Sequence, residues 1–124
     1  MGAITWVERR VGQALLSAVF VKSGFDVARS PGARLDKAAK LGLPNPELAV
    51  RANGAAMVVG GAALALNKVP RLAALGLIAS MIPTTIAGHP FWEFEGADRK
   101  AQEIHFAKNL GLMGGLVLVL TRSR

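Results

Sequence analysis

The sequence has no cysteine, only two histidines, and few charged residues, which make up 19% of its 124 positions. The missing cysteines exclude disulfides, thiolate metal sites and thiol exchange within the chain. The two histidines, His89 and His105, are not spaced to share one helix face as a pair of ligands, so we expect no metal or haem site. The shortage of charge is unlike soluble domains, which carry about 25% charged residues.

Apolar residues are correspondingly abundant. They make up 52% of the chain, its mean hydropathy is +0.37, and its length suits a single domain over residues 1–124. A spanning helix needs about 17–25 mostly apolar residues. The sequence therefore predicts an all-α integral membrane protein, an antiparallel bundle of four transmembrane helices at roughly 8–29, 47–67, 70–89 and 103–121. The second and third spans are strongly apolar, whereas the first and fourth reach spanning length only by including polar residues.

Two other interpretations of the apolar runs fit less well. A signal peptide is the first, but Lys22 interrupts the N-terminal run and no A-x-A-like cleavage site closes it. A soluble helical domain is the second, but the segment 55–66 has no polar face, and three neighbouring segments are similar. So small a soluble protein has too little interior to cover that many apolar helices.

The segments between the expected spans also contain patterns that predict structure. Apolar and charged residues alternate over 31–41, which predicts a short helix lying in the headgroup plane. Phe91, Trp92 and Phe94 are typical of an interfacial aromatic anchor, and a polar stretch follows over 95–103. Small residues at spacing four, such as Ala56 with Gly60, favour close helix packing.

Polar residues intrude into the spans, and the antiparallel arrangement gathers them at one end of the bundle. We expect the deeper ones to face the bundle interior, where Lys22 and Asp26 are spaced to pair along one helix face. The alternative, that these residues only mark the membrane boundary, applies to Arg51, Glu103 and Lys108. No catalytic constellation is recognised. The candidate binding residues are Lys22, Asp26, Arg51, Asn53, Thr84, Thr85, His89, His105, Lys108 and Asn109.

The net charge of +7 is concentrated at the opposite end, where six basic residues face Glu8 alone. We call this set the basic rim and expect it to contact anionic lipids. Because the remaining bases lie at the other membrane surface, no dense basic face for nucleic acid is predicted. The concentrated positive charge favours cytoplasmic termini. The rim consists of Arg9, Arg10, Lys68, Arg71, Arg122 and Arg124.

Several short motifs, in this order, resemble the DoxX family of small bacterial four-helix membrane proteins, and the match extends over nearly the whole chain. The most telling are Arg51-Ala-Asn-Gly54, Pro83-Thr-Thr-Ile-Ala-Gly-His-Pro-Phe-Trp92 and Gln102-x-x-His-Phe-x-Lys-Asn-Leu110. The first two resemble the actinobacterial version of the family. Many relatives carry Glu near the position of Asn53, so a carboxylate role does not transfer to this chain.

The resemblance implies a multi-pass protein of the bacterial cytoplasmic membrane linked to redox processes. We expect a non-enzymatic subunit or anchor, without intrinsic cofactor, bound to protein partners in a redox, respiratory or oxidative-stress membrane complex. The alternative is a quinone- or lipid-binding redox module at the polar end of the bundle. In that case Lys22, His89 and Asn109 would donate hydrogen bonds to a carbonyl, and Asp26 or His105 would relay protons.

Overall fold

The protein is a bundle of four long helices with two short ones in the connections. The structure, a computed structural model, describes residues 3–32 and 34–122. All four long helices are long and apolar enough to cross a membrane, which confirms the predicted four-helix membrane fold. The long helices are α1 (Ala3–Arg29), α3 (Pro46–Ala65), α4 (Pro70–Gly88) and α5 (Gly96–Thr121), and the short ones are α2 (Arg34–Lys40) and the 3₁₀ helix η1 (Phe91–Glu93).

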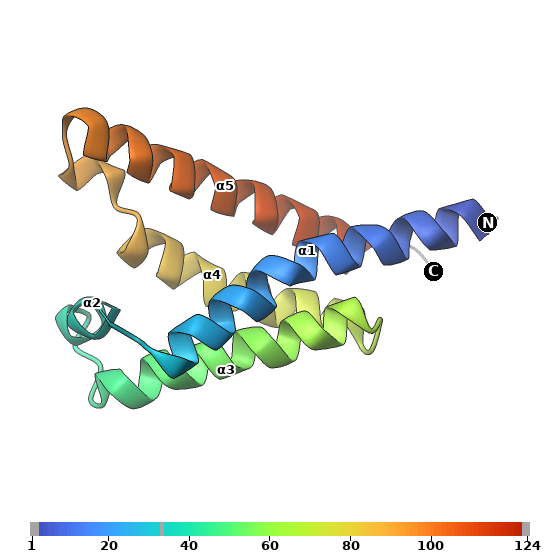
Figure 1. Ribbon diagram of the computed structural model, residues 1–124, viewed down its shortest axis with the longest axis horizontal. Helices are drawn as coiled ribbons and strands as arrows, with labels where there is room; N and C mark the ends of the chain where they lie inside the picture. The colour runs from blue at the N-terminus through green and yellow to red at the C-terminus, as the bar shows by residue number, and fades with distance from the viewer. Residues whose placement is uncertain (1–2, 33, 123–124) are drawn as a thin grey trace.

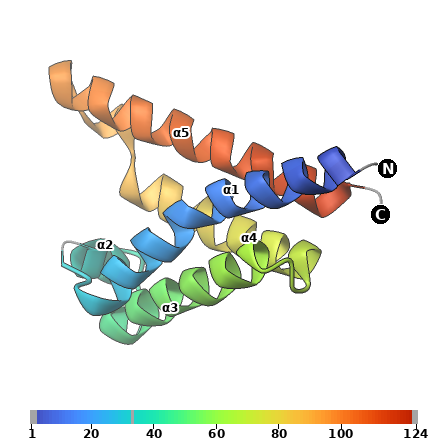
Figure 2. The same cartoon turned by 45° about the vertical axis from the view of Figure 1, so that its right-hand side comes forward.

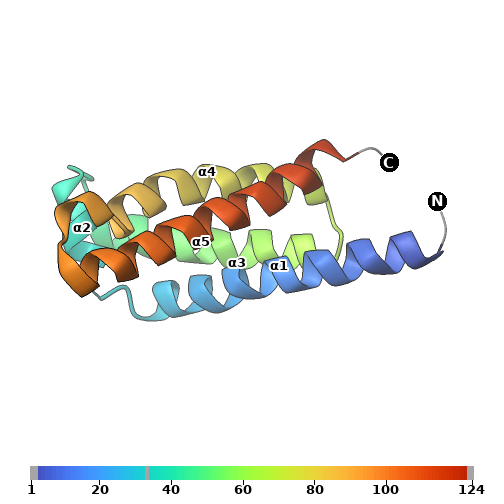
Figure 3. The ribbon, with the colours of Figure 1, turned by 90° about the horizontal axis from the view of Figure 1, so that it is seen from above.

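The long helices run antiparallel, so that the bundle has two distinct ends (Figure 1). Both ends of the chain and the α3–α4 connection lie at one end, which we call the terminal end. The short helices α2 and η1 lie at the other, which we call the polar end (Figure 3). Helix α1 packs most extensively on α3, and α4 packs mainly on α5 and α3. Helices α1 and α5 converge at the terminal end and separate toward the polar end (Figure 2).

The helix boundaries differ from the expected ones mainly in α1 and α5. Helix α5 begins at Gly96, seven residues before the expected start, so that most of the polar stretch 95–103 is helical. An ion pair of 2.9 Å between Arg99 Nε and Glu103 Oε1 spans one turn of this added segment. Helix α1 likewise starts before residue 8, at Ala3. The added part of α5 is polar, and the expected bound followed the apolar run that comes after it. The added part of α1, residues 3–7, is mostly apolar and is separated from the next apolar run by Glu8, Arg9 and Arg10.

The turn between α3 and α4 is tight. Helix α3 ends at Ala65, and Asn67 and Val69 then adopt left-handed backbone conformations, with φ of 57° and 39°. Pro70 follows at the first position of α4, where a missing N–H leaves no hydrogen bond unmade. This turn reverses the chain within four residues and brings α4 alongside α3.

Helices α1 and α3 approach each other through glycines. A Cβ on Gly54 would lie 2.7 Å from the carbonyl oxygen of Gly24. One step along the interface, a Cβ on Gly61 would lie 2.9 Å from Val21 Cγ2 and 3.3 Å from the carbonyl oxygen of Ser17. The contact repeats after seven residues on both helices, so two backbones meet along a seam that only small residues permit.

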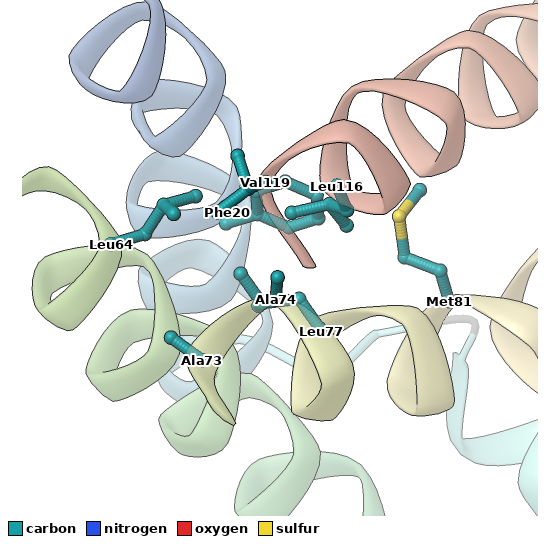
Figure 4. Packing of buried hydrophobic residues seen from close by; sticks show 8 residues of the cluster. All are labelled: Phe20, Leu64, Ala73, Ala74, Leu77, Met81, Leu116 and Val119. Atoms are coloured by element: carbon teal, nitrogen blue, oxygen red, sulfur yellow. The ribbon is translucent and has the colours of Figure 1, made fainter. Parts of the chain in front are cut away.

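A small apolar core joins all four long helices toward the terminal end (Figure 4). Helix α5 is the least buried of the four spans, since only 11% of its spanning segment is buried within the chain, against 28% for α1 and α4. Most of the α5 surface is therefore open to lipid or to a partner. The core consists of Phe20, Leu64, Ala73, Ala74, Leu77, Met81, Leu116 and Val119.

Candidate functional site

At the polar end, α4 and α5 are joined by two polar side-chain pairs. The amide of Asn109 donates to Thr85 Oγ1 at 3.0 Å, and Thr85 is almost fully buried. One turn further along α4, His89 Nδ1 donates to Gln102 Oε1 at 2.8 Å. Three of these four residues were among the sequence candidates, and the structure brings them together between the same two helices. Gln102 was missed as a site residue, although it belongs to the motif that carried the resemblance.

The second histidine lies against the first. The rings of His89 and His105 stack with centroids 5.0 Å apart and an angle of 22° between their planes. Beside them, the rings of Phe91, Trp92 and Phe106 meet edge to face, with both neighbours of Phe91 at 5.2 Å. The result is an aromatic corner at the start of α5, formed by η1 and the first turns of that helix. Within residues 3–32 and 34–122, no group of three or more histidine or acidic side chains is placed to hold a metal ion.

Asn53 joins α3 to α4 deeper in the bundle. Ser80 Oγ donates to Asn53 Oδ1 at 2.7 Å, and the Asn53 amide donates to Met57 Sδ at 3.7 Å. This pair satisfies an asparagine that lies half-buried within a span, where an unpaired amide is costly. Thr84 is exposed and bonds back to its own helix, with Oγ1 donating to the Ser80 carbonyl at 2.8 Å.

Two basic side chains cap helix ends at the polar end. Arg51 Nη1 donates to the carbonyl oxygen of Ala28 at 2.6 Å, near the C-terminus of α1, while Arg51 Nε pairs with Glu47 at 3.1 Å. Lys37 of α2 donates to the carbonyl oxygen of Gly88 at 3.0 Å, at the last residue of α4. A positive charge at a helix C-terminus interacts favourably with the helix dipole. Lys37 therefore anchors α2 on the bundle, a role not foreseen from the sequence.

Lys22 and Asp26 form the expected ion pair, at 2.5 Å, but not in the expected place. Their side chains are 76% and 54% exposed, so the pair lies on the outer face of α1 rather than in the bundle interior. The i, i+4 spacing predicts the pairing but not the direction in which the shared face points. Because the opposite face of α1 supplies Gly24 and Phe20 to the packing, the pair is turned outward.

Apart from Thr84, which bonds to its own helix, the candidates fall into two sets at this end. We call the first set the inner polar ties, since each of its members already bonds a neighbouring helix: Asn53, Thr85, His89 and Asn109. We call the second set the outer charged group, whose members are exposed: Lys22, Asp26, Arg51, His105 and Lys108. The first set holds the bundle together, and the second is exposed to the surroundings, with Arg51 also bonding the end of α1.

A further polar network, not predicted from the sequence, lies at the terminal end. Gln13 is almost fully buried, and its amide donates to the carbonyl oxygen of Leu64 at 2.8 Å and to Asn67 Oδ1 at 3.0 Å. Arg122 donates to Gln13 Oε1 and, at 3.1 Å, to Asn67 Oδ1. Gln13 and Arg122 lie 109 residues apart in the chain, so no local pattern could relate them. The network ties the end of α5 to α1 and to the α3–α4 turn.

Comparison with known proteins gives one family assignment. A sequence model of the DoxX family matches residues 11–90, which is more than half of the chain. No curated protein gave a significant match. No solved structure gave one either. The matched segment includes α1 from its third turn, α2, α3 and α4, and thus Asn53, Thr85 and His89 of the inner polar ties.

Proposed function

Because the chain belongs to the DoxX family, we propose that it is a non-catalytic membrane subunit or anchor of a redox assembly. It is a multi-pass membrane protein by its four spans and its family. The proposal adds a redox enzyme as partner, in a respiratory or oxidative-stress complex of the bacterial cytoplasmic membrane. It rests on the family and on the way polar groups are used at the polar end.

One observation carries this reading, namely the division of the polar end into bonded interior groups and exposed charges. The inner polar ties make their hydrogen bonds to neighbouring helices, which is consistent with a structural role. The outer charged group projects from the same end of the bundle, where Trp92 of the aromatic corner is also half-exposed. Aromatic anchors among polar neighbours are typical of protein interfaces. A partner enzyme would dock on this surface.

Mild-detergent purification with a tag, followed by mass spectrometry of the co-purifying proteins, tests the proposal. We expect one identified redox enzyme to be enriched, and to be lost from a variant with Trp92→Ala and Lys108→Gln. The matched control is Lys68→Gln, which removes one charge at the terminal end and leaves the polar end intact. Recovery of the protein without any redox enzyme, or equal loss in the control, would count against the anchor role.

A second candidate is a quinone- or lipid-binding module at the polar end, favoured by the stacked pair of His89 and His105. An exposed imidazole face at the start of α5 offers a flat surface and an N–H donor to a quinone carbonyl. The hydrogen-bond donors that the sequence suggested for a quinone, Lys22, His89 and Asn109, fit this site only in part. Asn109 already donates to Thr85, and Lys22 lies on α1, which separates from α5 at this end.

Extraction of the purified protein and spectroscopy of the extract tests the second candidate. A bound quinone that is lost in His105→Ala and retained in Lys108→Gln would support it. Protein that contains no quinone, and takes up none when a soluble quinone is added, would refute it.

A further inference from the structure

A shallow apolar groove runs along the outer surface between α3 and α4. Its volume is about 290 Å³. Val59 of α3 and Leu72 of α4 are exposed on its two sides, and small residues leave room between them. Nothing lies within 4 Å of a Cβ built on Gly76, so this part of the groove is open space. The lining residues from the two helices are mostly alanine and glycine, with Ser80 at the inner end.

A second, larger hollow of about 440 Å³ lies at the terminal end and is basic. Arg9, Arg71 and Arg122 line it, and no acidic residue is among the residues that form its wall. Val69 and Leu72 line both the hollow and the groove. The two therefore meet at these residues, with a basic end toward the membrane surface and an apolar end extending along the span.

Two of the arginines in the basic hollow, Arg71 and Arg122, make their hydrogen bonds to neutral acceptors. Arg71 donates to the backbone carbonyl of Arg122, and Arg122 donates to the side chains of Gln13 and Asn67. All these acceptors are neutral. Burial, together with the charges of Arg9 and Arg71, lowers the pKa of Arg122 from its ordinary value. An anion placed next to the guanidinium groups of Arg71 and Arg122 would relieve this repulsion.

The start of α4 adds to the attraction for an anion. Pro70, Arg71 and Leu72 of its first turn line the hollow, and no side chain caps this helix N-terminus. The first backbone N–H groups of a helix, with the positive end of its dipole, favour phosphate groups. An anion in the hollow would therefore be attracted both by the arginines and by the N-terminus of α4.

We propose that the hollow and the groove together bind one anionic phospholipid, with its phosphate among Arg9, Arg71 and Arg122 and one acyl chain in the α3–α4 groove. Charge complementarity selects the headgroup, and the adjoining apolar groove selects a lipid over a free anion. From Leu72 to Ser80 the groove follows eight residues of α4, which is about 12 Å of helix and covers the upper part of an acyl chain. The site lies at the opposite end from the proposed partner surface and does not depend on it.

Native mass spectrometry of the detergent-purified protein with added phosphatidylglycerol tests the headgroup contact. We expect one bound lipid per chain at saturation, and a reduction of about five-fold in lipid affinity for Arg71→Gln, as for the loss of one basic contact to an anionic lipid. Lys68→Gln is the matched control, because Lys68 belongs to the basic rim but does not line the hollow. An equal reduction in both variants would show a general charge effect and overturn the proposed site.

Filling the groove tests the acyl-chain contact. Gly76→Leu places a side chain in the open groove, and Gly114→Leu does the same on α5, where a Cβ also meets nothing within 4 Å. We expect lipid retention to fall in the first variant and to stay unchanged in the second, with helix content by circular dichroism equal in both. Ala56→Leu, from the α3 side, repeats the test if Gly76→Leu does not fold. Retention of lipid by a folded, filled variant would overturn the placement of the chain.

Competition with other ligands tests whether the hollow binds an anionic lipid, any lipid, a free anion or a quinone. Phosphatidylcholine with the same acyl chains should bind less than phosphatidylglycerol, and glycerophosphate alone should not displace the lipid. Equal binding of phosphatidylcholine would overturn the role of charge. Displacement by glycerophosphate at equal concentration would show a free-anion site instead, and displacement by a quinone, insensitive to Arg71→Gln, would show a different occupant.

Discussion

Gly24 and Gly54 face each other across α1 and α3 so closely that a Cβ on Gly24 would lie 2.6 Å from the carbonyl oxygen of Gly54. The relationship is reciprocal, since a Cβ on Gly54 would meet Gly24 in the same way. Real Cβ atoms do not approach a carbonyl oxygen so closely, and backbone cannot move aside as a flexible side chain can. The first two spans are therefore held at a separation set by glycine at these two positions.

We expect Gly54→Ala to lower the free energy of unfolding by about 1–3 kcal/mol, as overpacking of a close interface does. The measurement is unfolding of the protein in mixed micelles with increasing SDS, followed by tryptophan fluorescence. Gly76→Ala is the control, because its new methyl group meets open space. A cost for Gly54→Ala no larger than that of the control would mean that the two helices are not packed so tightly.

The network at the terminal end predicts a cost for Gln13→Leu. The change leaves the Leu64 carbonyl and the Arg122 guanidinium each short of one partner, so we expect a loss of about 1–3 kcal/mol in the same unfolding assay. Thr121→Val serves as the comparison, since Thr121 bonds only back to its own helix at Val117. A near-neutral Gln13→Leu would show that water or lipid replaces its contacts.

Thr85 and Asn109 predict a measurable coupling between α4 and α5. A double-mutant cycle with Thr85→Val and Asn109→Leu should give about 0.6 kcal/mol and no more than about 1.7 kcal/mol, the range for hydrogen bonds between membrane helices. Additive effects of the two substitutions would contradict the bond. The cycle reports on the pair itself because the loss of packing appears in each single variant.

The outward position of Lys22 and Asp26 predicts a weaker coupling. For an exposed pair at i, i+4 we expect about 0.3–0.5 kcal/mol from a cycle of Lys22→Gln and Asp26→Asn. Added salt should reduce it further, because exposed charges are screened. A coupling of several kcal/mol, insensitive to salt, would place the pair in a buried interface and restore the interior role expected from the sequence.

The basic rim predicts cytoplasmic termini. A fluorescent protein fused to the C-terminus should fluoresce, and an alkaline phosphatase fused there should be inactive, because each works on only one side of the membrane. The same reporters inserted at Gly42, in the exposed connection between α2 and α3, should give the opposite pair of results. Reversed outcomes at both positions would invert the orientation.

The sequence predicted the four spans because apolar runs of this length have few alternatives. It did not predict which face of α1 packs. The spacing of Lys22 and Asp26 describes a helix face, but only the position of Gly24 against Gly54 decides that this face points outward. That contact depends on two helices meeting, which neither sequence segment specifies alone.

The inner polar ties show the same limit of prediction from sequence. Thr85, His89 and Asn109 stood out because polar residues are unusual in spans, and they do lie together. Gln13 lies in an equally apolar run, yet its partner Arg122 is at the far end of the chain. Such a pair becomes visible only when the first and last spans are placed at one end of the bundle.

The preference of α1 for α3, and of α5 for α4, divides the protein into two consecutive hairpins, and this has a consequence for its biosynthesis. The first hairpin is complete in sequence at residue 65, before any of α4 has been translated. Its glycine seam can therefore close in the bilayer while the second half is still in the ribosome. Substitutions at Gly24 should then impair membrane insertion of the first half, whereas substitutions at Asn109 should affect only the assembly of the finished chain.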